Sequence, residues 1–112
     1  MTTMGTTTIT TTATNPRRAR LVAALLRIAP GLPRHEVEVV ADHAQDSAGL
    51  SKAKLETAAW LSLVAYARHM YSDYDTLLAD GYDHDSARHF ALADMNEALG
   101  AWGVKKRVGV GE

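Results

Sequence analysis

The stretch from residue 52 to residue 71 carries apolar side chains on almost every face of a predicted helix. These side chains are Leu55, Ala58, Ala59, Trp60, Leu61, Leu63, Val64, Ala65, Ala67 and Met70. A helix at the surface of a domain keeps a broad polar face, whereas a helix that is apolar all round packs against neighbours on several sides. We therefore expect residues 52 to 71 to form the central helix, with the rest of the chain arranged around it.

Residues that typically start and end helices divide the remaining chain into further segments. Asn15-Pro16 suits the start of a helix that Pro30-Gly31 ends, and Pro33 suits the start of the next one. The four expected segments run from about 16 to 29, from 33 to 48, through Leu77 and Leu78, and from a cap at Asp83 or Asp85 to Trp102. The sequence thus predicts an all-α fold, a small bundle of four main helices plus one short helix.

Composition sets the expected domain limits. Residues 1 to 14 are nearly all threonine and have little apolar surface to offset the entropy of ordering, so we predict a disordered tail. Residues 15 to 103 are predicted to form a single helical domain, a length that one hydrophobic core supports. Residues 104 to 112 are predicted to form a basic flexible tail.

The formal net charge of −1 conceals a separation of charge along the chain. Residues 73 to 97 contain seven acidic side chains against the single base Arg88. Basic side chains gather near both ends of the chain, and we regard them as candidate phosphate contacts: Arg17, Arg18, Arg20, Lys105, Lys106 and Arg107. An anion-binding patch would require the two basic segments to meet in the fold.

Several kinds of site and location are disfavoured by the sequence. The chain contains no cysteine, which excludes disulfides and a thiolate zinc site. His35 and His43 are eight residues apart, whereas the zinc-binding HExxH motif needs histidines four apart on one helix face, so we interpret the polar residues of the 33–48 helix as an outward polar stripe. We expect no metal and no cofactor. Without a secretory signal or an apolar run of about 18 residues, we expect a cytoplasmic protein with no membrane partner.

A polar break follows the central helix. It carries Arg68, His69, Tyr74 and Asp75, and Ser72 has the spacing of a helix cap. The last helix turns an apolar arc towards the expected core, formed by Ala87, Phe90, Ala91, Met95, Ala98, Leu99 and Trp102. Arg88 lies at the edge of this arc, and a charge near a core needs a partner. We therefore predict that Arg88 pairs with Asp73 or Asp75 and completes a polar seam of Arg68, His69, Tyr74, Asp75 and Arg88.

The seam also carries a resemblance to a known family. The run AYARHMYSDYDTLLADG, followed by DSARHF and LGAW, resembles the DUF2293 family of uncharacterised conserved proteins. The matching residues are Arg68, His69, Tyr74, Asp75, Leu77, Leu78, Ala87, Arg88 and Trp102, with Pro33, Glu36 and His43-Ala44 similar to the first half of the family. The likeness covers about residues 30 to 103. Ser72 stands where the family pattern has threonine, and Met70 where a further basic residue is frequent. The resemblance implies a shared fold and carries no established activity.

Three functions are compatible with these features. We favour a non-catalytic binding or regulatory module that contacts another protein or a second copy of itself, with Trp60 or Trp102 as anchors if they are exposed. The alternative is nucleic-acid binding through the basic first helix and the C-terminal tail. Catalysis would use His69 as a general base, but one histidine near an aspartate and tyrosines is a weak signal, and no nucleophile or phosphate-loop motif accompanies it.

Overall fold

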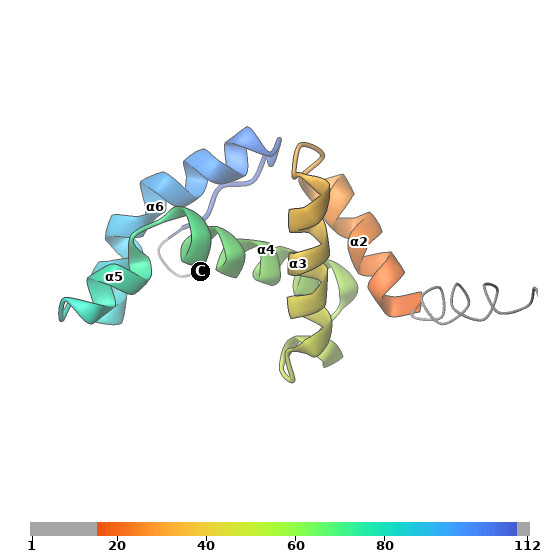
Figure 1. The fold of residues 1–112 in the computed structure, drawn as a ribbon, viewed down its shortest axis with the longest axis horizontal. Helices are drawn as coiled ribbons and strands as arrows, with labels where there is room; N and C mark the ends of the chain where they lie inside the picture. Colours follow the sequence, from red (N-terminus) through yellow and green to blue (C-terminus); the bar gives the residue numbers. More distant parts are fainter. Residues whose placement is uncertain (1–15, 110–112) are drawn as a thin grey trace, which may run out of the picture.

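A computed structural model describes residues 16 to 109, and its helices lie in the order shown in Figure 1. The helices are α2 (Pro16–Ile28), α3 (Arg34–Asp46), the 3₁₀ turn η1 (Leu50–Lys52), α4 (Leu55–Tyr71), α5 (Tyr74–Ala79) and α6 (His84–Ala101). No strand occurs among the described residues, so the predicted all-α fold of four main helices and one short helix is confirmed. The predicted threonine-rich tail and the cap at Asn15 lie outside these residues.

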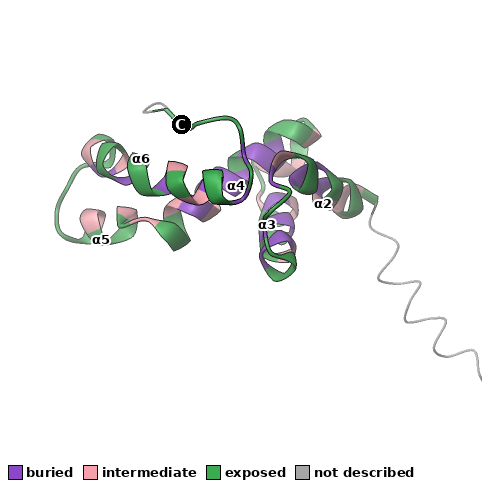
Figure 2. Ribbon diagram, turned by 90° about the horizontal axis from the view of Figure 1, so that it is seen from above, coloured by how far each residue is buried: buried purple, intermediate pink, exposed green. Residues whose placement is uncertain are grey.

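Helix α4 runs through the middle of the molecule and contacts both halves of the chain. Helices α2 and α3 pack against each other and against α4. Helix α6 packs on α4 as well and also contacts α5, so the two pairs lie towards opposite ends of α4 (Figure 1). The buried residues follow α4 and the inner sides of α2 and α3, whereas α5 has no fully buried residue (Figure 2).

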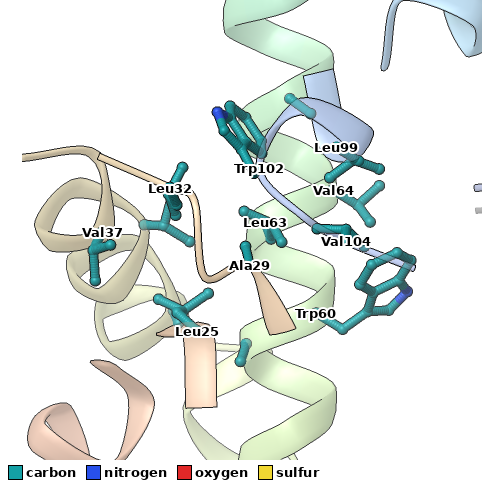
Figure 3. Close-up of a cluster of buried hydrophobic side chains, with 14 of the residues drawn as sticks. Leu25, Ala29, Leu32, Val37, Trp60, Leu63, Val64, Leu99, Trp102 and Val104 are labelled. Carbon is teal, nitrogen blue, oxygen red and sulfur yellow. The ribbon is translucent and has the colours of Figure 1, made fainter. Parts of the chain in front are cut away.

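The core around α4 is built from leucine, valine, alanine and tryptophan side chains. Leu25, Leu63 and Val37 are fully buried, and Leu99 brings α6 into the same cluster (Figure 3). Both tryptophans are nearly buried, with 9% of Trp60 and 6% of Trp102 exposed. Neither tryptophan is therefore the fully exposed anchor that a docking role would need, although one edge of Trp60 reaches a surface groove described below.

Helix α4 begins three residues later than predicted. Ser51 directly precedes the predicted start and is a suitable cap residue, but its hydroxyl donates to the carbonyl oxygen of Ala48 at 3.1 Å and lies within η1. Because this hydroxyl is bonded to a carbonyl of the preceding turn, it is not available to cap α4. Serine side chains commonly bond to nearby backbone groups in competition with helix capping. The helix ends as expected at Tyr71.

Two turns from distant parts of the chain meet at the end of α6. The amide of Gly31 donates to the carbonyl oxygen of Trp102 at 2.8 Å. A side chain at Gly31 would meet the backbone of Trp102 at 3.2 Å, and Gly103, with φ +84°, packs against the ring of Pro30. Glycine is needed at both positions, at one for close backbone approach and at the other for positive φ. This contact ties the α2–α3 loop to the end of α6.

The segment after Gly103 differs from the prediction of a flexible tail. Val104 and Val108 are buried, with 9% and 5% of their surfaces exposed. The side chain of Asn96 on α6 holds the segment by accepting from the Val108 amide at 2.7 Å and donating to the Val108 carbonyl at 3.2 Å. Residues 104 to 109 therefore lie along the body of the protein, because two valines four residues apart give them an apolar side to bury.

Candidate functional site

The structure brings the residues of the predicted seam together at the joint between α4, α5 and α6. His69 Nδ1 lies 2.5 Å from an oxygen of Asp75. The Arg68 guanidinium lies over the Tyr74 ring, 5.4 Å from its centroid, and the Tyr74 hydroxyl lies 3.0 Å from Nδ1 of His84 at the start of α6. The Ser72 hydroxyl accepts from the Tyr74 amide at 3.2 Å and so caps the first turn of α5. Asp75 contacts His69 and does not take part in this cap.

The predicted partner of Arg88 is wrong. Its guanidinium approaches Asp85, three residues earlier on the same helix, at 3.7 Å, and Asp85 has 93% of its side chain exposed. Asp75 is already engaged by His69, and a partner one turn away on α6 needs no alignment between helices.

Arg88 remains part of the joint, because its charge affects Arg68. Burial lowers the pKa of Arg68, the Tyr74 hydroxyl opposes this, and the nearby charge of Arg88 lowers it further.

The seam has the properties of a structural joint more than those of a pocket. His69 and Asp75 have 70% and 56% of their side chains exposed, and no seam residue lines either of the two cavities described below. Within residues 16 to 109, no group of three or more histidine, aspartate and glutamate side chains could hold a metal ion. An exposed His–Asp pair beside two arginines orients one helix on another without enclosing a substrate.

A second polar cluster, which the sequence did not predict, joins α3 to α4. Glu36 was expected on the outward polar stripe, yet only 5% of it is exposed. One of its carboxylate oxygens accepts from the hydroxyls of Tyr66 at 2.6 Å and Tyr71 at 2.5 Å, and both tyrosine rings pack against Trp102. Burial and the bond to Glu36 raise the pKa of Tyr66 above its usual range. The position of Glu36 at the edge of the apolar arc of its helix was the one sequence feature that could have predicted this cluster.

The same interface holds a second polar contact, one turn along α4 from Tyr66 and two turns along α3 from Glu36. Ser62 has 1% of its surface exposed, and its hydroxyl lies 3.2 Å from Nδ1 of His43. His43 therefore contacts α4 through its ring, although the residue as a whole is exposed like His35. The upstream residues of the resemblance, Glu36 and His43, thus both contact the central helix.

The larger of the two cavities is an open groove of about 820 Å³ between α2, α4 and the C-terminal segment. Its lining includes the apolar side chains of Ile28, Trp60, Leu61 and Val104, with Lys105 and Lys106 also at its wall. The ammonium of Lys106 lies 4.5 Å from the Trp60 ring centroid. Val104 lies close to Trp60 in Figure 3, so the segment after α6 forms one side of the groove.

The smaller cavity, of about 240 Å³, lies on α6 and is lined by Tyr71, Asp94, Glu97, Ala98, Ala101 and Trp102. It borders the Glu36 cluster, because Tyr71 and Trp102 belong to both. Two carboxylates and a tyrosine make this cavity acidic, in contrast to the groove, whose wall carries lysines.

The candidate phosphate contacts divide into two groups. Arg17 donates to the carbonyl oxygens of Leu50 and Ala53 at 3.1 and 3.0 Å, and Arg18 binds Glu38 and Asp42 at 2.7 and 2.8 Å. These two arginines therefore have partners within the fold.

The remaining basic residues are exposed. Arg20 faces solvent on α2, and Lys105, Lys106 and Arg107 are exposed along the C-terminal segment. Arg27, the last-turn arginine of α2, lines the groove together with Lys105 and Lys106 and so brings the two basic segments of the described chain to one surface.

Comparisons with known proteins agree with the resemblance read from the sequence. The model of the family described as "Uncharacterized conserved protein (DUF2293)" matches residues 24 to 103, which include α3, α4, α5 and α6. Comparison with curated proteins and with solved structures gave no match. Among residues 16 to 109, no helix combines the length and the apolar character that crossing a membrane requires. The matched region spans most of the chain and contains both polar clusters, and the protein accordingly belongs to the DUF2293 family.

Proposed function

We propose that this protein is a non-catalytic binding module that holds a segment of another polypeptide in the groove between α2, α4 and the C-terminal segment. The observation that carries the proposal is the groove itself, about 820 Å³ in volume, with apolar walls and lysines beside them. A cavity of that size falls within the range of ligand-binding clefts. Leu61, with 39% of its surface exposed between the buried residues Trp60 and Ser62, is explained by such an occupant.

The lining indicates the chemistry of the bound segment. Ile28, Trp60 and Leu61 offer an apolar surface on which an aromatic or branched side chain is desolvated. Lys105 and Lys106 lie beside that surface, and Arg27, also at the wall, is bridged to Glu56 at 2.7 Å. A segment with one large apolar side chain flanked by carboxylates complements both features.

The proposal is tested by titrating short synthetic peptides against the protein. One peptide carries a central phenylalanine flanked by aspartates, and a second carries the same phenylalanine flanked by lysines. In a Trp102→Phe background Trp60 is the only tryptophan, so its fluorescence reports occupancy of the groove. We expect the acidic peptide to change this fluorescence in a saturable way and the basic peptide to have no effect.

Two variants make the titration specific. Leu61→Glu places a carboxylate on the groove wall, and we expect it to weaken binding of the acidic peptide at least tenfold, about 1.4 kcal/mol. Val39→Glu is the matched control, because Val39 is half exposed on α3 and does not line the groove. Equal affinity of both variants for the peptide, or no binding by the parent protein, would contradict the proposal.

Nucleic-acid binding is the second candidate, and it has one supporting observation. Lys105, Lys106 and Arg107 are consecutive, exposed and basic. The support is smaller than the sequence suggested, because Arg17 and Arg18 bind groups of the protein itself. Fluorescence anisotropy with a labelled DNA duplex and a labelled single-stranded RNA at low salt tests this function. Affinity that falls steeply with added salt and is lost on replacing the three residues by alanine would favour it over protein binding.

We also propose a cytoplasmic location and a non-catalytic role. Support for the role comes from His69, the one candidate base, which lies on the surface with 70% of its side chain exposed and lines neither cavity.

A further inference from the structure

We propose that the occupant of the groove is a second copy of this chain, which inserts an exposed aromatic ridge formed by Tyr82 and Phe90. This inference rests on the proposed function of the groove. It adds a partner, a docking element and a geometry of assembly.

The ridge is the most exposed aromatic surface among the described residues. Phe90 has 58% and Tyr82 45% of its surface exposed, and the two rings pack edge to face with their centroids 5.8 Å apart. Phe90 was predicted on the apolar arc that faces the core, yet it points outward while Ala91 and Met95 fill the core side of α6. Large aromatic side chains held rigidly at a surface are typical anchors of protein interfaces.

Carboxylates accompany the ridge along α6. Asp94 and Glu97 follow Phe90 at the i+4 and i+7 positions, which places the three side chains on one helix face. Both carboxylates are exposed. An aromatic side chain with two acids on the same face is the chemistry that the groove complements, with apolar walls for the ring and Lys105 and Lys106 for the acids.

The ridge cannot occupy the groove of its own chain. Twelve residues of helix separate Phe90 from Trp102, a distance of about 18 Å along α6, and the groove begins just beyond, at Gly103. Ridge and groove therefore meet only between two molecules. Because they are different surfaces of the same chain, the contact is heterologous, and repeated contacts give either a closed ring or an open chain.

The first experiment measures the mass of the wild-type protein by light scattering over a wide range of concentration. We expect the weight-average mass to rise from the chain mass of 12.1 kDa to twice that value or more, and to fall back when salt is added. A mass that stays at one chain at every concentration in low salt would overturn the proposal, as would an assembly indifferent to salt.

The second experiment mixes two variants, each defective in one surface. Leu61→Glu disables the groove and keeps the ridge, and Phe90→Ser disables the ridge and keeps the groove. We expect each variant alone to be monomeric and the mixture to form a 1:1 dimer that cannot grow, with twice the mass of one chain. Val39→Glu should assemble like the wild type, and circular dichroism verifies that all three variants are folded.

The outcomes separate this inference from the proposed function. If the mixture stays monomeric while the acidic phenylalanine peptide still binds the groove, the second copy is not the occupant and the binding function stands. If neither the peptide nor the second copy binds, both proposals fail. If Leu61→Glu assembles like the wild type, the copies use a surface other than the groove, and the inference is wrong.

Discussion

Glu36 is a carboxylate held almost entirely out of water by two tyrosines. Its bonds to Tyr66 and Tyr71 reach from α3 to both the middle and the end of α4, and Trp102 covers the two rings. A buried carboxylate is tolerable only when its oxygens accept hydrogen bonds, so the cluster is stable as a unit and costly to dismantle in part. Its role here is to fix the angle between the two helices.

We predict that Glu36→Ala lowers the free energy of unfolding by about 2–3 kcal/mol, because two hydroxyls lose a charged acceptor and a cavity opens. Glu36→Gln keeps an acceptor oxygen of the same size at the same place, so its cost should be about 1 kcal/mol. Urea unfolding followed by circular dichroism measures both values. Equal losses for the two variants would mean that the tyrosine hydroxyls contribute nothing.

The Tyr66 hydroxyl should make the fold sensitive to alkali. Burial, and then the bond to Glu36, raise its pKa in the folded protein above the ordinary value of 10.0. Above pH 10 the unfolded chain releases this proton while the folded chain keeps it, so the contribution to stability is complete below pH 10 and is lost as the pH rises further. Urea unfolding at a series of alkaline pH values should show a smaller decline for Tyr66→Phe than for the wild type. Parallel declines would contradict the assignment.

At the scale of whole elements, the short helix α5 meets α4 and α6 through the seam. Most of its interactions are between exposed or half-exposed groups, such as the His69–Asp75 pair. Exposed ion pairs contribute about 0–1 kcal/mol each, so orientation of α5 depends on several weak contacts acting together. The absence of any fully buried residue in α5 agrees with that view.

Replacing Arg88 tests this reading of the joint. Its guanidinium is 3.7 Å from an exposed aspartate, and its buried Nε makes no hydrogen bond to any described residue. We predict that Arg88→Met lowers the free energy of unfolding by less than about 1 kcal/mol, because the stem of methionine replaces the packing and only an exposed ion pair is lost. A loss of 3 kcal/mol or more in thermal or urea unfolding would reveal a buried partner.

Sequence patterns were sufficient for the elements and insufficient for their contacts. The apolar character of α4, Pro30-Gly31 as the end of a helix, and Asp83 as a cap are all local properties, and each agrees with the structure. The partners of Arg88 and Glu36 depend on how helices are set against one another, which no local pattern encodes. The groove is lined by side chains as far apart in the sequence as Arg27 and Lys106, so no local pattern could predict it either. The spacing of Val104 and Val108 could have predicted a packed segment, but the basic residues between them favoured the prediction of a flexible tail.

At the scale of the molecule, the two helix pairs are joined by α4 and by one contact between turns. Gly31 and Trp102 approach so closely that an added methyl group would stand 3.2 Å from backbone atoms, which cannot give way as a side chain can. We predict that Gly31→Ala lowers the free energy of unfolding by about 1–3 kcal/mol, in the range of overpacked sites. Gly49→Ala is the matched control, because nothing lies within 4 Å of the corresponding position. Similar stability of the two variants would show that the turns separate without cost.

The groove has walls contributed by three segments that are far apart in the sequence, so it exists only while the chain is folded. Anything that fills it binds the native state alone and must shift the folding equilibrium by mass action. An occupant present at about a hundred times its dissociation constant would add about 2.7 kcal/mol to stability. For a domain of this size, each kcal/mol raises the melting temperature by about 4–8 °C. The melting temperature therefore reports binding to the groove. A collection of peptides can be ranked by the rise in melting temperature that each one causes, without any knowledge of what the partner does.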